Sequence, residues 1–166
     1  MKKVLSLLAA VLAVLFAVGC GGGTKVRDVS MFDLSRAMLG AAEFGEMSYV
    51  SSADDNAEDL LSNVSDIEWG KVRSFFIAYA TEGMGNADEI VVIAVSDPAD
   101  VAEAEASLRA HLESRRAIYA TYDPTQSGKL EEGTVFTVDN LAVLTVTGDN
   151  GAVKDALDKF ISDSER

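Results

Sequence analysis

Several residue types that support common protein chemistries are scarce in this sequence of 166 residues. It contains one cysteine, one histidine, one tryptophan and two prolines. A single cysteine excludes a disulfide within the chain, so the hydrophobic core alone must stabilise the fold. The single histidine, His111, has no second histidine or cysteine with which to form a zinc site. We interpret His111 as a surface or boundary residue of a helix.

Recognisable motifs for metals, nucleotides and nucleophilic catalysis are also missing. The acidic run 54–59 lacks the alternating aspartates and glycine of a calcium loop, and it predicts a solvated loop. Gly83-Met84-Gly85 lies between two predicted strands, whereas a nucleotide-binding loop joins a strand to a helix. Nucleophilic catalysis would require a base beside a serine, and no pattern marks such a pair. We therefore predict no catalytic residue, no metal, no cofactor and no enzymatic activity.

Positive charge is in short supply. The chain has 27 acidic and 14 basic residues, a net charge of −13, and every acidic residue follows Cys20. An acidic surface repels nucleic acid and anionic lipid headgroups, so neither is an expected partner. The simplest interpretation of this acidity is solubility.

The N-terminal 20 residues contain the one processing motif in the chain. Lys2-Lys3 precedes an apolar run over 4–18, which is shorter than the roughly 20 residues that span a membrane. Ala17-Val18-Gly19-Cys20 then ends the run. This order resembles a bacterial lipoprotein signal peptide, in which the cysteine thiol receives a diacylglyceryl group. The alternative is cleavage by ordinary signal peptidase, which would leave a free thiol at Cys20.

The lipoprotein resemblance implies a division of the chain into three parts. Residues 1–19 are the signal peptide, residues 20–29 are a glycine-rich flexible tether, and residues 30–166 are a single domain. The resemblance also implies that lipid on Cys20 holds the domain on the extracytoplasmic face of the cell membrane, where two acyl chains suffice for stable anchoring.

Hydrophobic periodicity and capping residues predict the elements of the domain. A first helix begins at the cap Ser30 and stops at Gly45, and a longer one begins at Asp97-Pro98 and ends at Pro124. The remaining predicted elements are a short helix over 57–63, strands over 71–81, 89–95, 134–138 and 141–147, and a final helix after Asp149. The order is a helix followed by two ββα units. It predicts an α+β fold with one antiparallel sheet and the two later helices packed on one face.

Both sides of the predicted strands are apolar, so something must cover the second face of the sheet. Phe75 and Ile77 alternate with Phe76 and Ala78, which places large apolar side chains on both faces. The N-terminal helix, through Leu34, Met38 and Ala41, is the expected cover. A partner protein or a second copy is the alternative.

Several stretches of the domain also resemble a known family. They are residues 87–92, 112–116 and 119–124 and the last predicted hairpin. Over residues 30–161 the chain is similar to bacterial lipoproteins of the family called domain of unknown function 4358. The resemblance implies an extracytoplasmic lipoprotein and assigns no mechanism.

One candidate recognition patch remains, at the end of the long helix. It consists of Arg115, Arg116, Tyr119 and Tyr122, of which Arg115 and Tyr119, and Tyr119 and Tyr122, share a helix face. The alternative is ordinary structure, with cations near a helix C-terminus and tyrosines at a core edge. We predict a lipid-anchored binding or interaction module with an envelope protein as its candidate partner. The alternative functions are an enzyme-associated factor and a small-ligand-binding lipoprotein.

Overall fold

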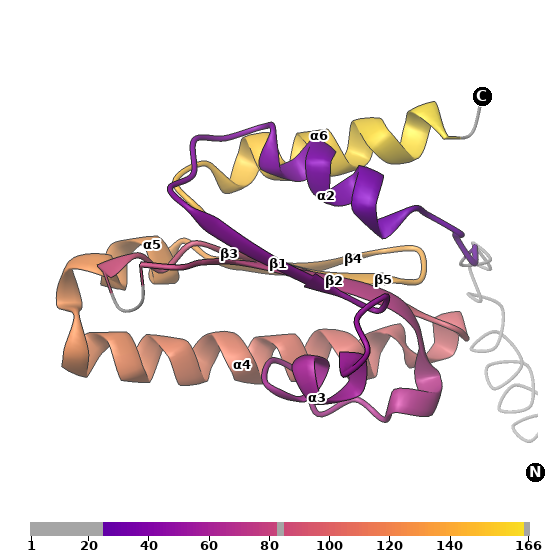
Figure 1. The fold of residues 1–166 in the computed structure, drawn as a ribbon, viewed down its shortest axis with the longest axis horizontal. Coiled ribbons are helices and arrows are strands. Elements are labelled where there is room, and N and C mark those ends of the chain that lie inside the picture. The colour runs from indigo at the N-terminus through magenta and orange to yellow at the C-terminus, as the bar shows by residue number, and fades with distance from the viewer. Residues whose placement is uncertain (1–24, 83–84, 165–166) are drawn as a thin grey trace, which may run out of the picture.

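Figure 1 shows the computed structural model of the chain, which describes residues 25–82 and 85–164. The predicted signal peptide and Cys20 lie outside the described residues. Within the described part, five strands form one antiparallel sheet in the order β1-β2-β3-β5-β4. The strands are β1 (Met47–Ser51), β2 (Val72–Ala80), β3 (Glu89–Val95), β4 (Thr134–Val138) and β5 (Leu141–Val146). The predicted α+β class with a single antiparallel sheet is confirmed.

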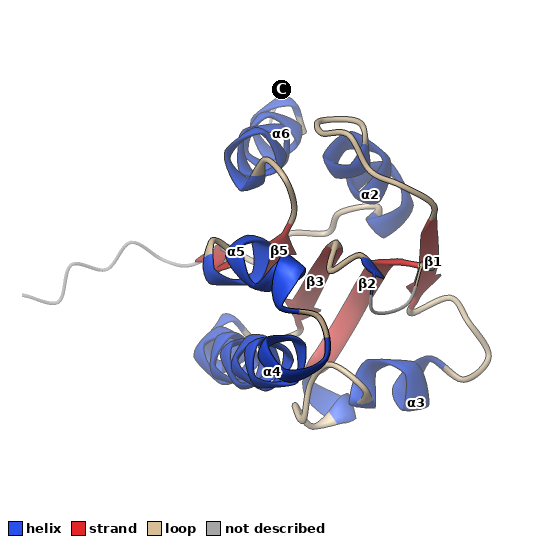
Figure 2. Cartoon of the chain, turned by 90° about the vertical axis from the view of Figure 1, so that its left-hand side faces the viewer, coloured by secondary structure: helices blue, strands red, loops and turns tan. Residues whose placement is uncertain are grey.

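Helices cover both faces of this sheet (Figures 1 and 2). The helices α2 (Met31–Leu39) and α6 (Asn150–Asp163) lie on one face. On the other face lie α3 (Ala57–Ser62), α4 (Val101–Tyr122) and α5 (Ser127–Glu131). Three short 3₁₀ turns precede β2, α4 and α5, namely η1 (Trp69–Lys71), η3 (Pro98–Asp100) and η4 (Pro124–Gln126).

The prediction that the two later helices share a face was wrong. Ala104 and Leu108 of α4 pack with Phe75 and its neighbours, whereas Leu157 of α6 packs with Phe76 on the opposite face. The central strands β3 and β5 are buried at every position, so both of their faces need a helical cover. Placing α4 and α6 on opposite faces provides this cover.

The predicted cover for the second face is confirmed, and α6 contributes to it. Leu34 and Met38 of α2 are fully buried against Phe76 and the same face of β3. Ala41, the third residue predicted for this cover, follows the end of α2 and is only half-buried. α6 adds Val153, Leu157 and Ile161 to this cluster. The described part of the chain therefore provides its own cover for both faces of the sheet.

Ser30 caps α2 as the sequence predicts, and Asp97 caps the 3₁₀ turn η3, which leads directly into α4 at Val101. The Ser30 hydroxyl accepts from the Asp33 N–H at 3.2 Å, and the Asp97 carboxylate accepts from the Ala99 N–H at 2.9 Å. The predicted end of the first helix at Gly45 was wrong, because α2 ends at Leu39 and the Gly40 N–H caps its last carbonyls. The chain then turns into the edge strand β1, which the sequence prediction missed, as it missed α5.

Candidate functional site

The most buried group of ionisable side chains in the described structure surrounds Glu89, the first residue of β3. The Glu89 side chain is 7% exposed. Its Oε2 atom accepts a hydrogen bond from Arg115 Nη1 at 2.9 Å and lies 3.0 Å from His111 Nε2. His111 and Arg115 are four positions apart on α4, so one face of that helix presents both groups to the strand.

The geometry defines the hydrogen-bonding roles of these groups. An ionised carboxylate can only accept, so the contact with Glu89 requires a proton on His111 Nε2. Glu89 Oε1 has no hydrogen-bond partner among the described residues. In the same part of the chain, every side-chain nitrogen or oxygen that is completely buried does have a partner. Oε1 is therefore an acceptor that is not completely buried.

Glu89 also lines a cavity of about 300 Å³ between α3, α4 and strands β1–β3. Most of the cavity wall is apolar, and Glu89 and His111 form its ionisable part. The lining residues are Val50, Leu60, Asn63, Val64, Ile77, Tyr79, Glu89 and His111. A concave apolar surface with a few convergent polar groups is the usual form of a small-ligand site, and 300 Å³ lies at the small end of the range.

A larger hollow of about 550 Å³ lies between the start of α2 and β1. Its charged residues are Asp28 and Arg73, whose side chains form an exposed ion pair with 3.1 Å between Oδ2 and Nη2. Exposed charges are well solvated and interact weakly with a ligand, whereas buried charges interact strongly. The smaller cavity beside Glu89 is therefore the better candidate for a binding site.

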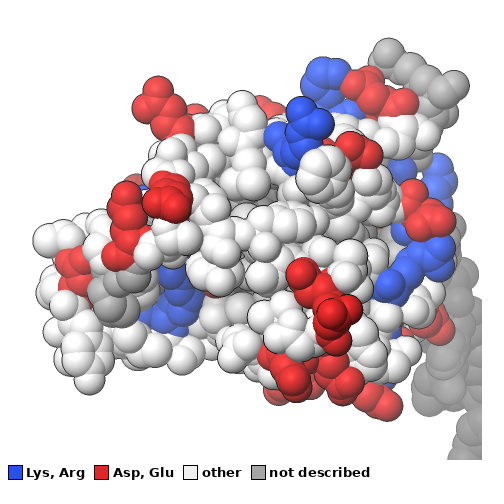
Figure 3. All heavy atoms as spheres, in the orientation of Figure 1, with Lys and Arg blue, Asp and Glu red and all other residues white. Residues whose placement is uncertain are grey.

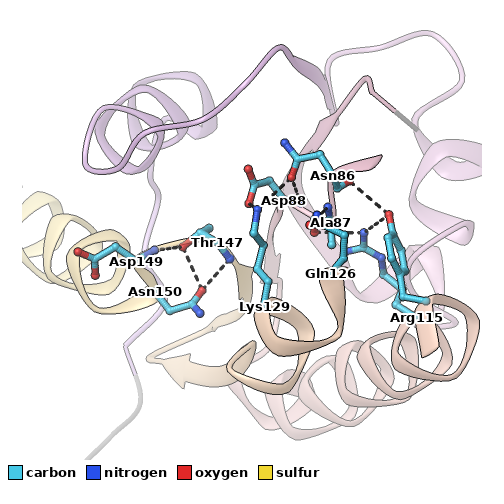
Figure 4. A network of polar contacts seen from close by, with 10 residues as sticks. Asn86, Ala87, Asp88, Arg115, Gln126, Lys129, Thr147, Asp149 and Asn150 are labelled. Atoms are coloured by element: carbon cyan, nitrogen blue, oxygen red, sulfur yellow. Dashed lines mark hydrogen bonds and ion pairs between the residues drawn. The ribbon is translucent and has the colours of Figure 1, made fainter. Parts of the chain in front are cut away.

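A second polar network holds the segment that leads into Glu89 (Figure 4). Lys129 Nζ lies 2.6 Å from Asp88 Oδ1, and the Gln126 side chain accepts from the Ala87 N–H at 3.1 Å. From α4, Arg115 Nη2 donates to the Ala87 carbonyl at 3.2 Å. The start of β3 is thus attached to both α4 and α5, which fixes the position of the Glu89 carboxylate.

The four residues of the predicted recognition patch lie in different environments. The side chain of Arg115 is 14% exposed and binds Glu89, and that of Arg116 donates to carbonyls around α5, including Leu130 O at 2.9 Å. Tyr119 is buried, and its hydroxyl donates to the Asn86 carbonyl. Tyr122 is 76% exposed, so it does not cover an edge of the core. The structure therefore brings Arg115 and Tyr119 together inside the fold and leaves Tyr122 outside.

His111 lies at the boundary between core and surface, as expected from the sequence. Glu89 was missed as a site residue, although the sequence contains one signal that points to it. Glu89 is the only charged residue in a strand whose other residues are all apolar, and charged residues are seldom fully buried without a partner. His111 and Arg115, one helical turn apart, are the partners that this strand position requires.

Other site classes find no support in the described residues. No group of three or more His, Cys, Asp and Glu side chains there is arranged to hold a metal ion. Across residues 25–82 and 85–164, no helix combines the length and the apolar character needed to cross a membrane.

Comparison with known proteins gives one match. The family model called Domain of unknown function (DUF4358) matches residues 48–147, which run from β1 to the end of β5. All residues that line the cavity fall inside this range, and α2 and α6 fall outside it. Neither the curated proteins nor the solved structures gave a match. Because the family model covers more than half of the sequence, the chain belongs to the family Domain of unknown function (DUF4358).

Proposed function

We propose that this chain is a lipid-anchored binding module on the extracytoplasmic face of the cell membrane, and that its cavity beside Glu89 holds a small ligand. The anchor rests on the N-terminal motif, in which a lysine pair, an apolar run and Ala17-Val18-Gly19 precede Cys20. Diacylglycerol and an amide-linked acyl chain such as palmitate on this cysteine suffice for stable attachment.

The single observation that carries the binding function is the environment of Glu89. Its side chain is almost fully buried and lines an apolar cavity, its Oε2 atom contacts His111 and Arg115, and its Oε1 atom has no hydrogen-bond partner among the described residues. Small-ligand sites are mostly apolar cavities with a few polar or charged groups that orient the ligand. The Arg115 charge compensates the carboxylate, so the ligand need not be ionised.

The chemistry of the cavity selects a class of ligand. The apolar residues Val50, Val64 and Ile77 accommodate a short hydrocarbon or aromatic body. Glu89 Oε1 accepts from a hydroxyl, amine or amide N–H at one end of that body. The ligand is therefore a small molecule that combines an apolar body with one hydrogen-bond donor.

The experiment that tests this function is an NMR titration of the ¹⁵N-labelled domain with matched probes. Benzyl alcohol and benzylamine carry a donor, and toluene is the control that lacks one. We expect the first two to shift the amide resonances of residues around the cavity, and toluene to bind at least about tenfold more weakly, because a buried hydrogen bond to a charged group contributes about 1.5–3 kcal/mol.

Two variants connect these shifts to the cavity. Leu60→Trp places a large ring in the wall of the cavity and is expected to abolish the shifts. Ile118→Trp adds the same ring on the exposed side of α4 and is the matched control, which should bind as the unmodified protein does. Shifts that survive Leu60→Trp, or the absence of shifts with both donor probes at millimolar concentration, would reject the cavity as the site.

The anchor has its own test. Cys20→Ser removes the thiol that receives lipid, and it should move the protein from the membrane fraction to the medium or leave an uncleaved precursor. The matched control is Ser6→Ala, a change within the apolar run that keeps Cys20. A mature chain that begins at Cys20 and carries no added lipid mass would contradict the anchor.

A protein partner is the second candidate function, and one surface feature favours it. Ile118 and Tyr122 are both exposed apolar residues, and they are four positions apart on α4. Residues with this spacing lie side by side on the helix surface. Crosslinking in the native membrane should then give an envelope protein adduct that is lost in a double Ile118→Ser and Tyr122→Ser variant, and an unchanged adduct would exclude this surface.

A further inference from the structure

The described N-terminal segment is attached to one end of the sheet. The Arg27 N–H donates to Asn140 Oδ1 at 2.7 Å, and the Arg27 side chain forms an ion pair with the Asp139 carboxylate. Asp139 and Asn140 form the turn between β4 and β5, where Asp139 adopts a positive φ of 52° that a short polar side chain tolerates. The last residues of the predicted tether, 27–29, are thus part of the domain.

The turn that receives Arg27 is itself fixed to the sheet. Asn140 is fully buried, its Nδ2 donates to the Val95 carbonyl at 2.8 Å, and its own carbonyl accepts from the Val95 N–H at 2.9 Å. Val95 ends β3 and pairs with Val72 at the start of β2. The N-terminal segment therefore leaves the domain at the end where β2 begins, β3 ends and β5 begins.

The opposite end of the domain lies at the far end of α4. That helix has 22 residues, which corresponds to a length of about 33 Å. It begins at Val101, six residues after Val95, and ends at Tyr122, beside α5 (Figure 1). Cys20 precedes Arg27 by seven positions, so even a fully extended chain between them spans only about 25 Å. The reach of the tether is shorter than the domain is long.

We infer that the end face formed by the β4–β5 turn, residues 27–28, Trp69 and Arg73 is the surface that faces the lipid bilayer, and that the short tether sets this orientation. The inference rests on the proposed lipid at Cys20. The end of α4 with Tyr122 then points away from the membrane and is accessible to partners.

Electrostatic attraction to lipid is not the cause of this orientation. Three basic side chains at the end face are paired with carboxylates, Arg27 with Asp139, Arg73 with Asp28, and Lys71 with Glu103. Figure 3 shows several basic residues near this end. Paired charges attract an anionic surface only weakly, and salt screens what remains. The orientation is therefore expected to be the same on neutral and anionic bilayers.

Tryptophan fluorescence tests this orientation, because Trp69 is the only tryptophan of the chain. The lipidated protein is reconstituted in liposomes that carry dansyl-labelled headgroups, and energy transfer from tryptophan to dansyl is measured. A second protein with Trp69→Phe and Tyr122→Trp moves the sole donor to the far end of α4. Transfer from Trp69 should be at least about twofold stronger, because about 33 Å of helix separates the two ends.

Further arms separate the causes. Neutral and anionic liposomes should give the same difference, and an insertion of about 20 Gly/Ser residues after Gly23 should reduce it, because such a linker adds about 25 Å of reach. Equal or stronger transfer from position 122, a difference seen only with anionic lipid, or a difference unchanged by the insertion would overturn the inference.

The lipid anchor is tested separately, by flotation of the same protein with liposomes. If the purified protein carries no lipid, the mature chain is coupled through the Cys20 thiol to maleimide-headgroup lipid, and the two donors are compared again. Stronger transfer from Trp69 than from position 122 in the maleimide-coupled protein would support the orientation even though the natural anchor is absent. Equal transfer from the two positions would reject the orientation independently of the anchor.

Discussion

Replacing Glu89 by glutamine perturbs the buried cluster while keeping the shape of the side chain. The Glu89 carboxylate accepts from Arg115 at 2.9 Å and contacts His111 at 3.0 Å, in a site that is almost closed to solvent. The amide of glutamine carries no charge, so the Arg115 guanidinium loses its counterion in a poorly solvated place. Removing one partner of a buried ion pair costs about 3–5 kcal/mol, and the remaining amide carbonyl recovers part of that as an acceptor.

We therefore expect Glu89→Gln to lower the free energy of unfolding by about 2 to 4 kcal/mol, measured by urea denaturation with circular dichroism. The matched control is Glu113→Gln, which removes the same charge from a pair with Arg116 on the same helix. The Glu113 side chain is 68% exposed, and an exposed pair contributes at most about 1 kcal/mol. Equal losses in the two variants would refute the conclusion that the Glu89 cluster is a buried ion pair.

Three further predictions concern the packing that positions the site. Leu108→Ala removes a fully buried side chain of α4 and should lower the free energy of unfolding by about 2 to 5 kcal/mol. The control Ser114→Ala changes an exposed residue of the same helix and should alter the free energy of unfolding by less than about 0.5 kcal/mol. Asp97→Ala removes the hydrogen bond to the Ala99 N–H and should cost about 1 kcal/mol in the same assay, and no change would show that this cap is dispensable. Deletion of residues 30–45 removes the α2 part of the cover on one face of the sheet, so the truncated protein should aggregate in size-exclusion chromatography or unfold at lower urea concentration, and a monodisperse, equally stable monomer would contradict the packing of α2.

The elements that the sequence predicted correctly are those with strong local signals. β3 and β5 are almost entirely apolar, and the segment that forms η3 and α4 has a cap at Asp97 and a stop at Pro124. Local sequence is therefore enough to predict these elements. β1 was missed because five half-polar residues at a sheet edge have no clear period, and pairing with β2 is what makes them a strand. α5 is a single short turn of helix that its contacts with α4 hold in place.

The side of the sheet on which each helix packs could not be predicted from the sequence. Strands that are apolar on both faces can pack a helix on either face. The short turn between β5 and α6 has no sequence pattern that predicts on which face α6 packs. The candidate site was out of reach for a related reason. Glu89 and His111 are 22 positions apart on different elements, and only the packing of α4 on the sheet brings them into contact.

Native mass spectrometry of the protein extracted from its own membrane can detect both the lipid on Cys20 and a small molecule bound in the cavity beside Glu89. We expect a chain that begins at Cys20 and carries lipid, together with a small noncovalent ligand that is present in the Ile118→Trp control and absent from Leu60→Trp. A protein with no bound small molecule, or one whose bound molecule is unaffected by Leu60→Trp, would contradict the claim that the cavity beside Glu89 is a binding site.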